Sequence, residues 1–489
     1  MSVALRPERP PNPRVGLLDR LGPVLLIVAT GIVLGFQFIV PDKRMIAVIA
    51  TIIMFGLAWR LDMAAGLGVL AIALPFPRGT TFGNTNLALV AIIAVIWLLR
   101  ASLGQSARPQ RSPLDVPVLA LFVAYVISFY NIANAVDLGL ALVIFEMFAA
   151  AVLMFFVIVN NLQDERSFRR FLEFQVISVL LVCLLAVWEL SHPGQALITG
   201  WIELEKNALG TGNAEIFLHN IRVGSSFSDY ELLAEYCALN SLLVLFLFLR
   251  AETMIRRVAL AAMLPLIAFV LFATVTRGAI ISLAAGLLYL AWILRRRLNF
   301  VMLVTVVVAL VLGFQSMNYY VASFTRSGNL LSRFAGSSGF VGVLPEERAG
   351  IWMEAWGRIF EHPLIGHGPY YSIMSGTRTY LWPHNLYLLV ANNVGFIGLG
   401  IFLWLLWTLL KISRPRTDDL RRGEFMDSYM IIAHVQLVAF LIDQTKIDFV
   451  RNGTYQFQVW LMFALITAAY RISRAPRALA VVPAGHPRA

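Results

Sequence analysis

Apolar segments of about 15 to 25 residues, nearly free of charge, follow one another along almost the whole chain, and about 20 apolar residues suffice for a helix to cross a bilayer. The pattern predicts fourteen membrane-spanning helices. Because the second and third segments are short, one of them could be re-entrant or strongly tilted, and a count of twelve or thirteen also fits. The fourteen segments are 22–40, 45–59, 62–75, 85–100, 114–131, 138–159, 168–190, 229–249, 257–275, 278–294, 299–317, 384–410, 425–443 and 455–472.

The composition agrees with this pattern. The chain has 489 residues, of which 59% are hydrophobic and 14% charged, and its mean hydropathy is +0.75. Soluble globular domains average nearer ~45–50% apolar residues, so the excess must face lipid. We therefore predict an all-α, polytopic integral membrane protein with about 12–14 transmembrane helices.

The distribution of lysine and arginine predicts the orientation. With the N-terminus in the cytoplasm, 26 of the 39 lysines and arginines fall in inner segments, as the positive-inside rule requires. The net charge of +11 then reflects contact with the anionic inner leaflet. A nucleic-acid partner would need a soluble basic domain, and the sequence predicts none.

The same reading divides the chain into seven parts, with two long loops on the outer side and no cleavable signal peptide at the start. The parts are a cytoplasmic basic leader (1–21), N-terminal transmembrane helices (22–190), a periplasmic loop (191–228), transmembrane helices (229–317), a large, partly helical periplasmic loop (318–383), C-terminal transmembrane helices (384–472) and a cytoplasmic tail (473–489).

Metal ligands and disulfides are not indicated. Cys183 and Cys237 both fall inside apolar segments and have no metal-ligand spacing. His362 and His367 lie close together in the second loop, but no third or fourth ligand follows at zinc spacing. We therefore expect chemistry without a metal or cofactor.

Several arginines lie on the predicted outer side, against the charge bias. Arg277 is the sharpest case, because "ATVTRGAIIS" places it in a short turn between two apolar segments. An ionisable residue there is costly and indicates a functional site, although an arginine that snorkels to lipid phosphate is the alternative. Arg222 stands before another apolar segment, where a solvated loop arginine is equally plausible. Arg348 begins an amphipathic helix in the second loop.

The most distinctive polar pair is His384-Asn385 in "WPHNLYLLVANNVGFIGLG". Pro383 suits the first turn of a helix, and helix N-termini favour anions and a neutral imidazole. Three following glycines, at 395, 398 and 400, predict close packing of that helix. A histidine hydrogen-bonded to its own first turn is the plainer alternative.

A base at a helix entrance, with arginines on the same side, suits transfer of a sugar from a lipid pyrophosphate. The leaving group then needs cations, and the acceptor hydroxyl needs a base to take its proton. The planar guanidinium of arginine matches phosphate oxygens. The pattern favours a metal-free glycosyl transfer with inversion.

The sequence resembles the O-antigen ligase and polysaccharide polymerase superfamily of bacterial membrane glycosyltransferases. The residues that carry the likeness are His384-Asn385 followed after nine residues by Gly395 and Gly398, "EHPLIGHGP" downstream of Arg348 and Trp352, and "TRGAIISLAAGLL". "RVGSSF" is similar only in part, because Asp229-Tyr230-Glu231 replaces the usual Pro-Asn. The likeness is closest over about residues 215 to 400.

The resemblance implies an enzyme of the bacterial inner membrane whose active site faces the periplasm. It would transfer undecaprenyl-pyrophosphate-linked glycan to a lipid or glycan acceptor without a metal. The family's essential histidine falls on His384 and its phosphate-binding arginines fall on Arg222 and Arg348, with Arg277 as a third. Asn385 adjoins the histidine, and an acidic residue of the last outer loop, Asp443 or Asp448, would assist.

Three readings stay open from the sequence. A ligase or a surface or exopolysaccharide polymerase is favoured over a protein O-oligosaccharyltransferase, because nothing indicates a peptide groove. A transporter or flippase of lipid-linked sugars would have charges near the midplane and repeated halves, whereas these candidates gather on one side and no repeat is evident. The oligomeric state is left undetermined.

Overall fold

The structure is a computed structural model in which a large, mostly helical part of the chain is described. The described residues are 63–76, 79–80, 83–104, 109–192, 223–227, 229–274, 276–297, 315, 319, 346–370, 374–375, 378–379, 383–421, 423–451 and 453–474.

Helices account for nearly all of these residues, joined by three short 3-10 turns and two hairpins of two-residue strands. The α-helices are α3 (Met63–Ala73), α4 (Thr85–Ser102), α5 (Asp115–Ser128), α6 (Ala135–Asn161), α7 (Glu165–Ser191), α10 (Tyr230–Leu249), α11 (Met254–Ala273), α12 (Arg277–Ile293), α15 (Glu346–Glu361), α16 (Leu386–Ser413), α17 (Phe425–Asp443) and α18 (Gly453–Arg474). The 3-10 turns are η1 (Phe129–Asn131), η2 (Ser225–Phe227) and η3 (Phe449–Arg451), and the hairpins pair β1 (Gly79–Thr80) with β2 (Gly83–Asn84) and β3 (Met374–Ser375) with β4 (Arg378–Thr379).

Eleven of the fourteen predicted spans coincide with helices of the structure. The segments 22–40 and 45–59 lie outside the described residues, as does 299–317 apart from Gln315. Within the described part, six helices are long and apolar enough to cross a membrane, namely α6, α7, α10, α11, α16 and α17. The chain is therefore a polytopic helical membrane protein, as its hydropathy predicts.

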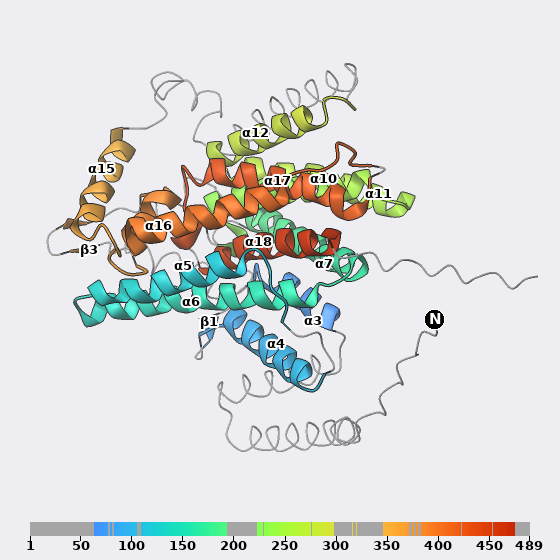
Figure 1. The fold of residues 1–489 in the computed structure, drawn as a ribbon. Coiled ribbons are helices and arrows are strands. Elements are labelled where there is room, and N and C mark those ends of the chain that lie inside the picture. Colours follow the sequence, from blue (N-terminus) through green and yellow to red (C-terminus); the bar gives the residue numbers. More distant parts are fainter. Residues whose placement is uncertain are drawn as a thin grey trace, which may run out of the picture.

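The long helices α6, α16, α17 and α18 run alongside one another in the bundle (Figure 1). Their shared core is dense with aromatic residues: the Trp460 ring of α18 contacts Phe155 of α6 at 6.0 Å and Phe463 at 5.7 Å between centroids. Aromatic pairs in such edge-to-face contacts add to the dispersion energy that holds helices together in lipid, where the hydrophobic effect between helices is lost.

Helix α16 is interrupted, and the interruption shapes one end of the bundle. Gly395 has φ 68° and ψ −174°, a conformation essentially reserved for glycine, so α16 consists of two half-helices that meet at this residue. The break leaves N–H and C=O groups without partners inside the helix, and such groups must be satisfied within the protein at membrane depth.

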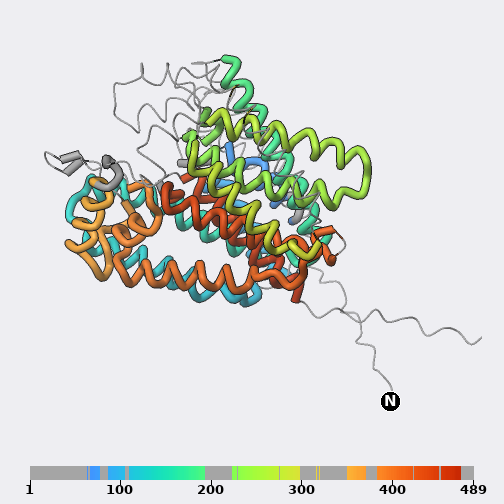
Figure 2. The backbone as a smooth tube through the Cα atoms, turned by 90° about the horizontal axis from the view of Figure 1, so that it is seen from above, coloured from blue at the N-terminus to red at the C-terminus, as the bar shows by residue number. Residues whose placement is uncertain are grey.

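The turn His362–Pro369, which follows α15, supplies those partners. Phe396 N donates to Pro363 O at 2.7 Å, whereas the carbonyls of Asn392 and Asn393 accept from His367 N at 2.8 Å and Gly368 N at 3.0 Å. The approach is so close that a Cβ on Gly395 would lie 2.3 Å from the Leu364 carbonyl. The turn is thus docked by backbone hydrogen bonds, and with α15 it lies at one end of the bundle (Figure 2).

His367 gives this docked turn a pH dependence. Burial lowers the pKa of His367 below its ordinary value of 6.5, although its Nε2 lies 2.7 Å from Arg358 O, a contact that works in the opposite direction. The folded state favours the neutral imidazole. The contribution of His367 to the stability of the fold is therefore fully present above pH 6.5, and it is lost as the pH drops from there to the lowered pKa of the folded state.

We expect His367→Gln to flatten the pH dependence of stability. In detergent, the melting temperature of the wild-type protein should fall more between pH 7.5 and pH 5 than that of the variant. The control is His192→Gln, which changes an exposed histidine after α7. Equal slopes for the wild type and His367→Gln would contradict the assignment.

Helices α10, α12 and α16 begin, and α17 ends, at the same end of the bundle. Leu386 N of α16 donates to Gln444 O after α17 at 3.0 Å, and Thr276 Oγ1 before α12 donates to Tyr230 O of α10 at 3.4 Å. At the opposite end, the Arg250 guanidinium after α10 donates to Gly423 O before α17 at 2.7 Å. This arrangement agrees with the alternation of spans that the charge pattern predicts.

Candidate functional site

His384 lies at the end of the bundle where these helix termini meet. It precedes α16, has a left-handed backbone at φ 46°, and its Nδ1 lies 3.7 Å from Glu231 Oε2 of α10. The imidazole is 32% exposed and the Glu231 side chain 17%. Because α16 begins at Leu386, the expectation that Pro383 and His384 occupy its first turn is wrong: both precede the helix.

Asn385 is the N-cap of α16. Its Oδ1 accepts from Tyr387 N at 3.0 Å and Leu388 N at 3.1 Å, and its Nδ2 donates to Thr445 O at 3.2 Å. The residue is 8% exposed. Since both ends of the amide are engaged within the chain, the structure gives Asn385 a structural role that fixes the backbone beside His384. A direct contact with substrate stays a prediction.

Asp443 lies against the start of α12 at this end. Asp443 is the last residue of α17 and only 4% exposed, and a Cβ on Gly278 would lie 3.1 Å from its Oδ1. Arg277, the first residue of α12, is partly exposed. Glu231 and Lys446 are both near enough to Asp443 to interact with it electrostatically. Glu231 therefore interacts with both the His384 imidazole and Asp443.

The structure describes less of the other two predicted arginines, Arg348 and Arg222. Arg348 belongs to α15, whose Trp352, one turn later, donates from Nε1 to Pro383 O at 2.8 Å. This bond ties the start of α15 to the residue before His384. The Arg348 side chain and the whole of Arg222 lie outside the described residues.

Sequence reasoning missed Glu231 as the partner of His384 and a second carboxylate, Glu235, one turn below it. Glu235 Oε1 accepts from Gln444 Nε2 at 2.7 Å, and both residues are buried to 1% exposure or less. Gln444 Oε1 in turn accepts from Phe449 N at 3.2 Å. The available signal was the pair of glutamates at positions i and i+4 in "YELLAEY", because ionisable residues inside a span are expensive.

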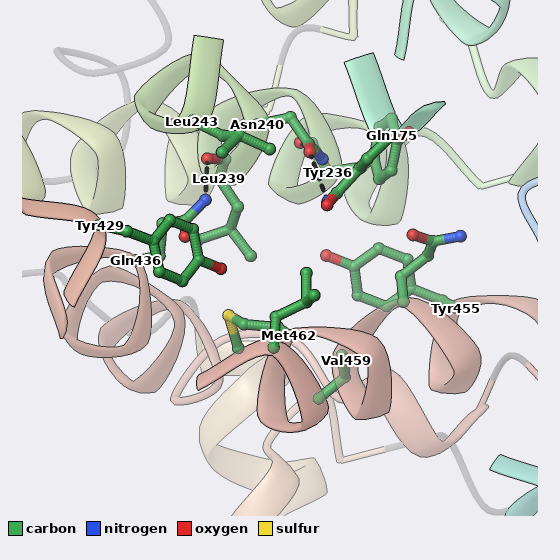
Figure 3. Close-up of a pocket in the computed structure, with 12 residues that line it drawn as sticks. Gln175, Tyr236, Leu239, Asn240, Leu243, Tyr429, Gln436, Tyr455, Val459 and Met462 are labelled. Atoms are coloured by element: carbon green, nitrogen blue, oxygen red, sulfur yellow. Dashed lines mark hydrogen bonds between the residues drawn. The ribbon is translucent and has the colours of Figure 1, made fainter. Parts of the chain in front are cut away.

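A small polar cavity lies deeper in the bundle, between α7, α10, α17 and α18 (Figure 3). Its volume is ≈ 30 Å³, enough for about two water molecules. Tyr455, which is hydrogen-bonded to Glu235, lines the cavity together with Tyr429, whose hydroxyl is directed into it in Figure 3. The buried Glu235 and Gln444 pair thus lies between the site around His384 and this cavity.

No three histidine, cysteine, aspartate or glutamate side chains gather as a metal site among the residues that the structure describes. The polar groups that converge are one imidazole, two carboxylates and two cations, on four helix ends. Such a set can accept a proton and bind an anion.

Residues 259–403 match the protein-family model described as O-antigen ligase. That part of the chain is therefore similar to the O-antigen ligase family. The O-antigen ligase segment begins inside α11, contains Arg277, Arg348 and the docked His362–Pro369 turn, and ends eight residues after the Gly395 break. No curated protein matches the chain.

The superfamily supports a glycosyltransferase activity of the ligase or polymerase type, acting on lipid-linked glycans in a membrane. His384 and Asn385 lie within the matched segment, whereas Glu231 and Asp443 lie outside it and reach the same site through α10 and α17. The site around His384 is therefore assembled from inside and outside the O-antigen ligase segment.

Proposed function

We propose that the protein is a metal-independent, inverting glycosyltransferase that transfers undecaprenyl-pyrophosphate-linked glycan to an acceptor hydroxyl at the periplasmic face of a bacterial inner membrane. The acceptor is the lipid of a surface glycan, for an O-antigen ligase, or a growing glycan, for a surface or exopolysaccharide polymerase. Resemblance to the superfamily supports the donor class, and the geometry of the site supports the roles of the residues.

The observation that carries the proposal is that His384, Glu231 and Asp443 interact at the end of the bundle where Arg277 begins α12. The base precedes α16 and the cation begins α12, more than 100 residues apart in the chain, yet both lie at the same end of the bundle. A base and a cation at the predicted outer side are what a transfer between a lipid pyrophosphate and a hydroxyl requires.

In the proposed reaction, the neutral His384 imidazole accepts the proton of the acceptor hydroxyl as its oxygen attacks the anomeric carbon. The bond from that carbon to the phosphate oxygen breaks, and the electron pair leaves with the undecaprenyl pyrophosphate. Glu231 holds the imidazole in position and stabilises the imidazolium that forms. Attack opposite the leaving group inverts the anomeric configuration.

The arginines serve the leaving group. Arg277 and, on our proposal, Arg222 and Arg348 bind the pyrophosphate oxygens, because a guanidinium can donate two parallel hydrogen bonds to phosphate. Asp443 lies against Gly278 and interacts electrostatically with Lys446. The leaving pyrophosphate needs no protonation if these cations neutralise its charge as the bond breaks.

Arg277→Lys is the experiment that tests the pyrophosphate contact. The variant keeps the charge but loses the bidentate geometry, so we expect kcat/KM for the lipid-linked donor to fall roughly tenfold, mainly through KM. The measurement is glycan transfer by purified protein in vesicles at varied donor concentration. Arg421→Lys, an exposed arginine at the opposite end of the bundle, is the control. Equal donor KM for wild type and Arg277→Lys would contradict the contact.

A gene deletion separates the ligase from the polymerase. Long chains stranded on the lipid carrier would identify a ligase, and single repeat units in place of long chains would identify a polymerase.

A further inference from the structure

A large basic cavity lies at the end of the bundle opposite His384. It is formed where α12 and α16 end, with His434 from the middle of α17 in its wall, and its volume is ≈ 650 Å³, within the size range of ~300–1,000 Å³ typical of ligand sites. The lining residues are Tyr289, Trp292, Ile293, Arg295, Arg296, Leu410, Arg414, Pro415, Arg416, Thr417, Asp418 and His434.

The cavity has an excess of positive charge. Four arginines line it, at positions 295, 296, 414 and 416, against the single carboxylate of Asp418. That carboxylate already binds the Arg297 guanidinium, 3.4 Å away. In the described part of the chain, the structure shows no ion pair for Arg296, Arg414 or Arg416. Four like charges around one hollow repel one another, and an anion in the hollow relieves that repulsion.

One wall of the cavity is aromatic and held in place. The rings of Tyr289 and Trp292 stack at 5.8 Å, and the Arg295 guanidinium lies 4.7 Å from the Trp292 ring centroid. His434 Nε2 lies 3.2 Å from the Tyr289 hydroxyl, and its Nδ1 lies 2.8 Å from Ser413 Oγ. These contacts hold the aromatic side chains of the wall in place, and none of them involves Arg296, Arg414 or Arg416.

The faces of α12 and α16 that lead to the cavity are apolar and exposed. Leu288, four residues before Trp292, is 71% exposed, and Trp407, seven residues before Arg414, is 68% exposed. Residues at these spacings share a helix face, so each apolar side chain lies on the membrane side of a cavity residue. A lipid headgroup in the cavity could therefore keep its acyl chains against Leu288 and Trp407.

We propose that this cavity binds the phosphate headgroup of an anionic phospholipid, with arginines around the phosphate and acyl chains along α12 and α16. A free phosphate would use the same arginines, but it would gain nothing from the exposed apolar faces beside them. Basic pockets between helices at the inner membrane surface have the chemistry for such headgroups. The site is independent of the glycosyl transfer proposed above.

The test is lipid titration of the purified full-length protein by native mass spectrometry. Cardiolipin and phosphatidylethanolamine are the anionic and zwitterionic probes, and inorganic pyrophosphate is the soluble one. The variant Arg414→Gln with Arg416→Gln is compared with Arg421→Gln, which removes one exposed charge from the same connection outside the cavity. Arg296→Gln, on a different helix end, serves as a second variant if the first unfolds.

The wild-type protein should retain cardiolipin in preference to phosphatidylethanolamine, and the double variant should bind it roughly thirtyfold more weakly, since each arginine near the headgroup contributes about a fivefold factor. Arg421→Gln should bind as the wild type does, and pyrophosphate should not displace the lipid. Equal weakening in Arg421→Gln, or unchanged binding in the cavity variants, would overturn the proposal. Displacement of cardiolipin by pyrophosphate would overturn the lipid as the occupant.

Discussion

Replacing His384 with asparagine should lower the rate of glycan transfer by a factor on the order of 10³, within the range attributed to a general base. Asparagine tolerates the left-handed backbone that the structure shows at this position, at φ 46°, better than most residues. The substitution thus removes the imidazole without adding backbone strain, and Asn385 continues to cap α16. The measurement is turnover by purified protein at saturating donor and acceptor.

The matched control is His362→Asn, which changes an exposed histidine at the start of the docked turn and should retain turnover. Glu231→Gln provides a second check, because in the proposed reaction Glu231 acts on the imidazole. The substitution should lower turnover in the wild type but have little further effect in His384→Asn, since residues that act as a unit are not additive. Full turnover by His384→Asn would show that His384 is not the general base.

Substituting Gly395 with alanine should undock the His362–Pro369 turn and greatly reduce the yield of folded protein. The conformation of Gly395 is strained for any residue with a Cβ, at a cost of about 1–3 kcal/mol. That Cβ would also lie 2.3 Å from the backbone of Leu364, where no flexible side chain can move aside. The measurement is the melting temperature, together with the elution profile of the protein in detergent.

The same substitution five residues further along α16 supplies the control. A Cβ on Gly400 meets nothing within 4 Å, so Gly400→Ala should leave the protein folded or stabilise it by up to about 1 kcal/mol through helix propensity. If Gly395→Ala were as stable as Gly400→Ala, the contact between the turn and the interrupted helix would be wrong.

Hydrophobic pattern predicted the helices well because apolar length is a strong local signal in membrane proteins. The span predicted at 425–443 coincides with α17, and that at 229–249 differs from α10 by one residue. The prediction of an amphipathic helix after Arg348 agrees with α15. The two-residue hairpins were not predicted, because strands of two residues are too short to show an alternation of apolar and polar residues in the sequence.

The interruption of α16 depends on contacts that the local sequence does not contain. The three glycines at 395, 398 and 400 predicted close helix packing, but they differ in the structure: Gly395 breaks the helix, and a Cβ on Gly398 would meet only Val394 of its own helix. The glycine spacing identified the right segment. Only the docking of a turn some 30 residues upstream reveals why the first of these glycines is required.

The candidate site was predicted in part. His384, Arg277 and Asp443 were singled out from polarity and resemblance, and the structure brings them to one end of the bundle. Glu231 was not singled out as a site residue, because its contact with His384 joins segments about 150 residues apart. The roles of Arg222 and Arg348 stay predictions, since their side chains lie outside the described residues.

The interrupted helix bears on the transporter alternative. Transporters use discontinuous helices to form substrate sites near the midplane. In this protein, the backbone groups at the break are occupied by Pro363, His367 and Gly368 of the docked turn. The break therefore serves the docking of the turn His362–Pro369.

The most direct test of the central claim follows both products of the proposed reaction. Purified protein in vesicles receives undecaprenyl-pyrophosphate-linked glycan and an acceptor glycolipid or oligosaccharide in the presence of EDTA, and mass spectrometry measures the extended acceptor and the freed undecaprenyl pyrophosphate. We expect the two products to appear in equal amounts and both to form about a thousandfold more slowly with His384→Asn. Movement of intact donor between leaflets, without release of undecaprenyl pyrophosphate, would contradict it.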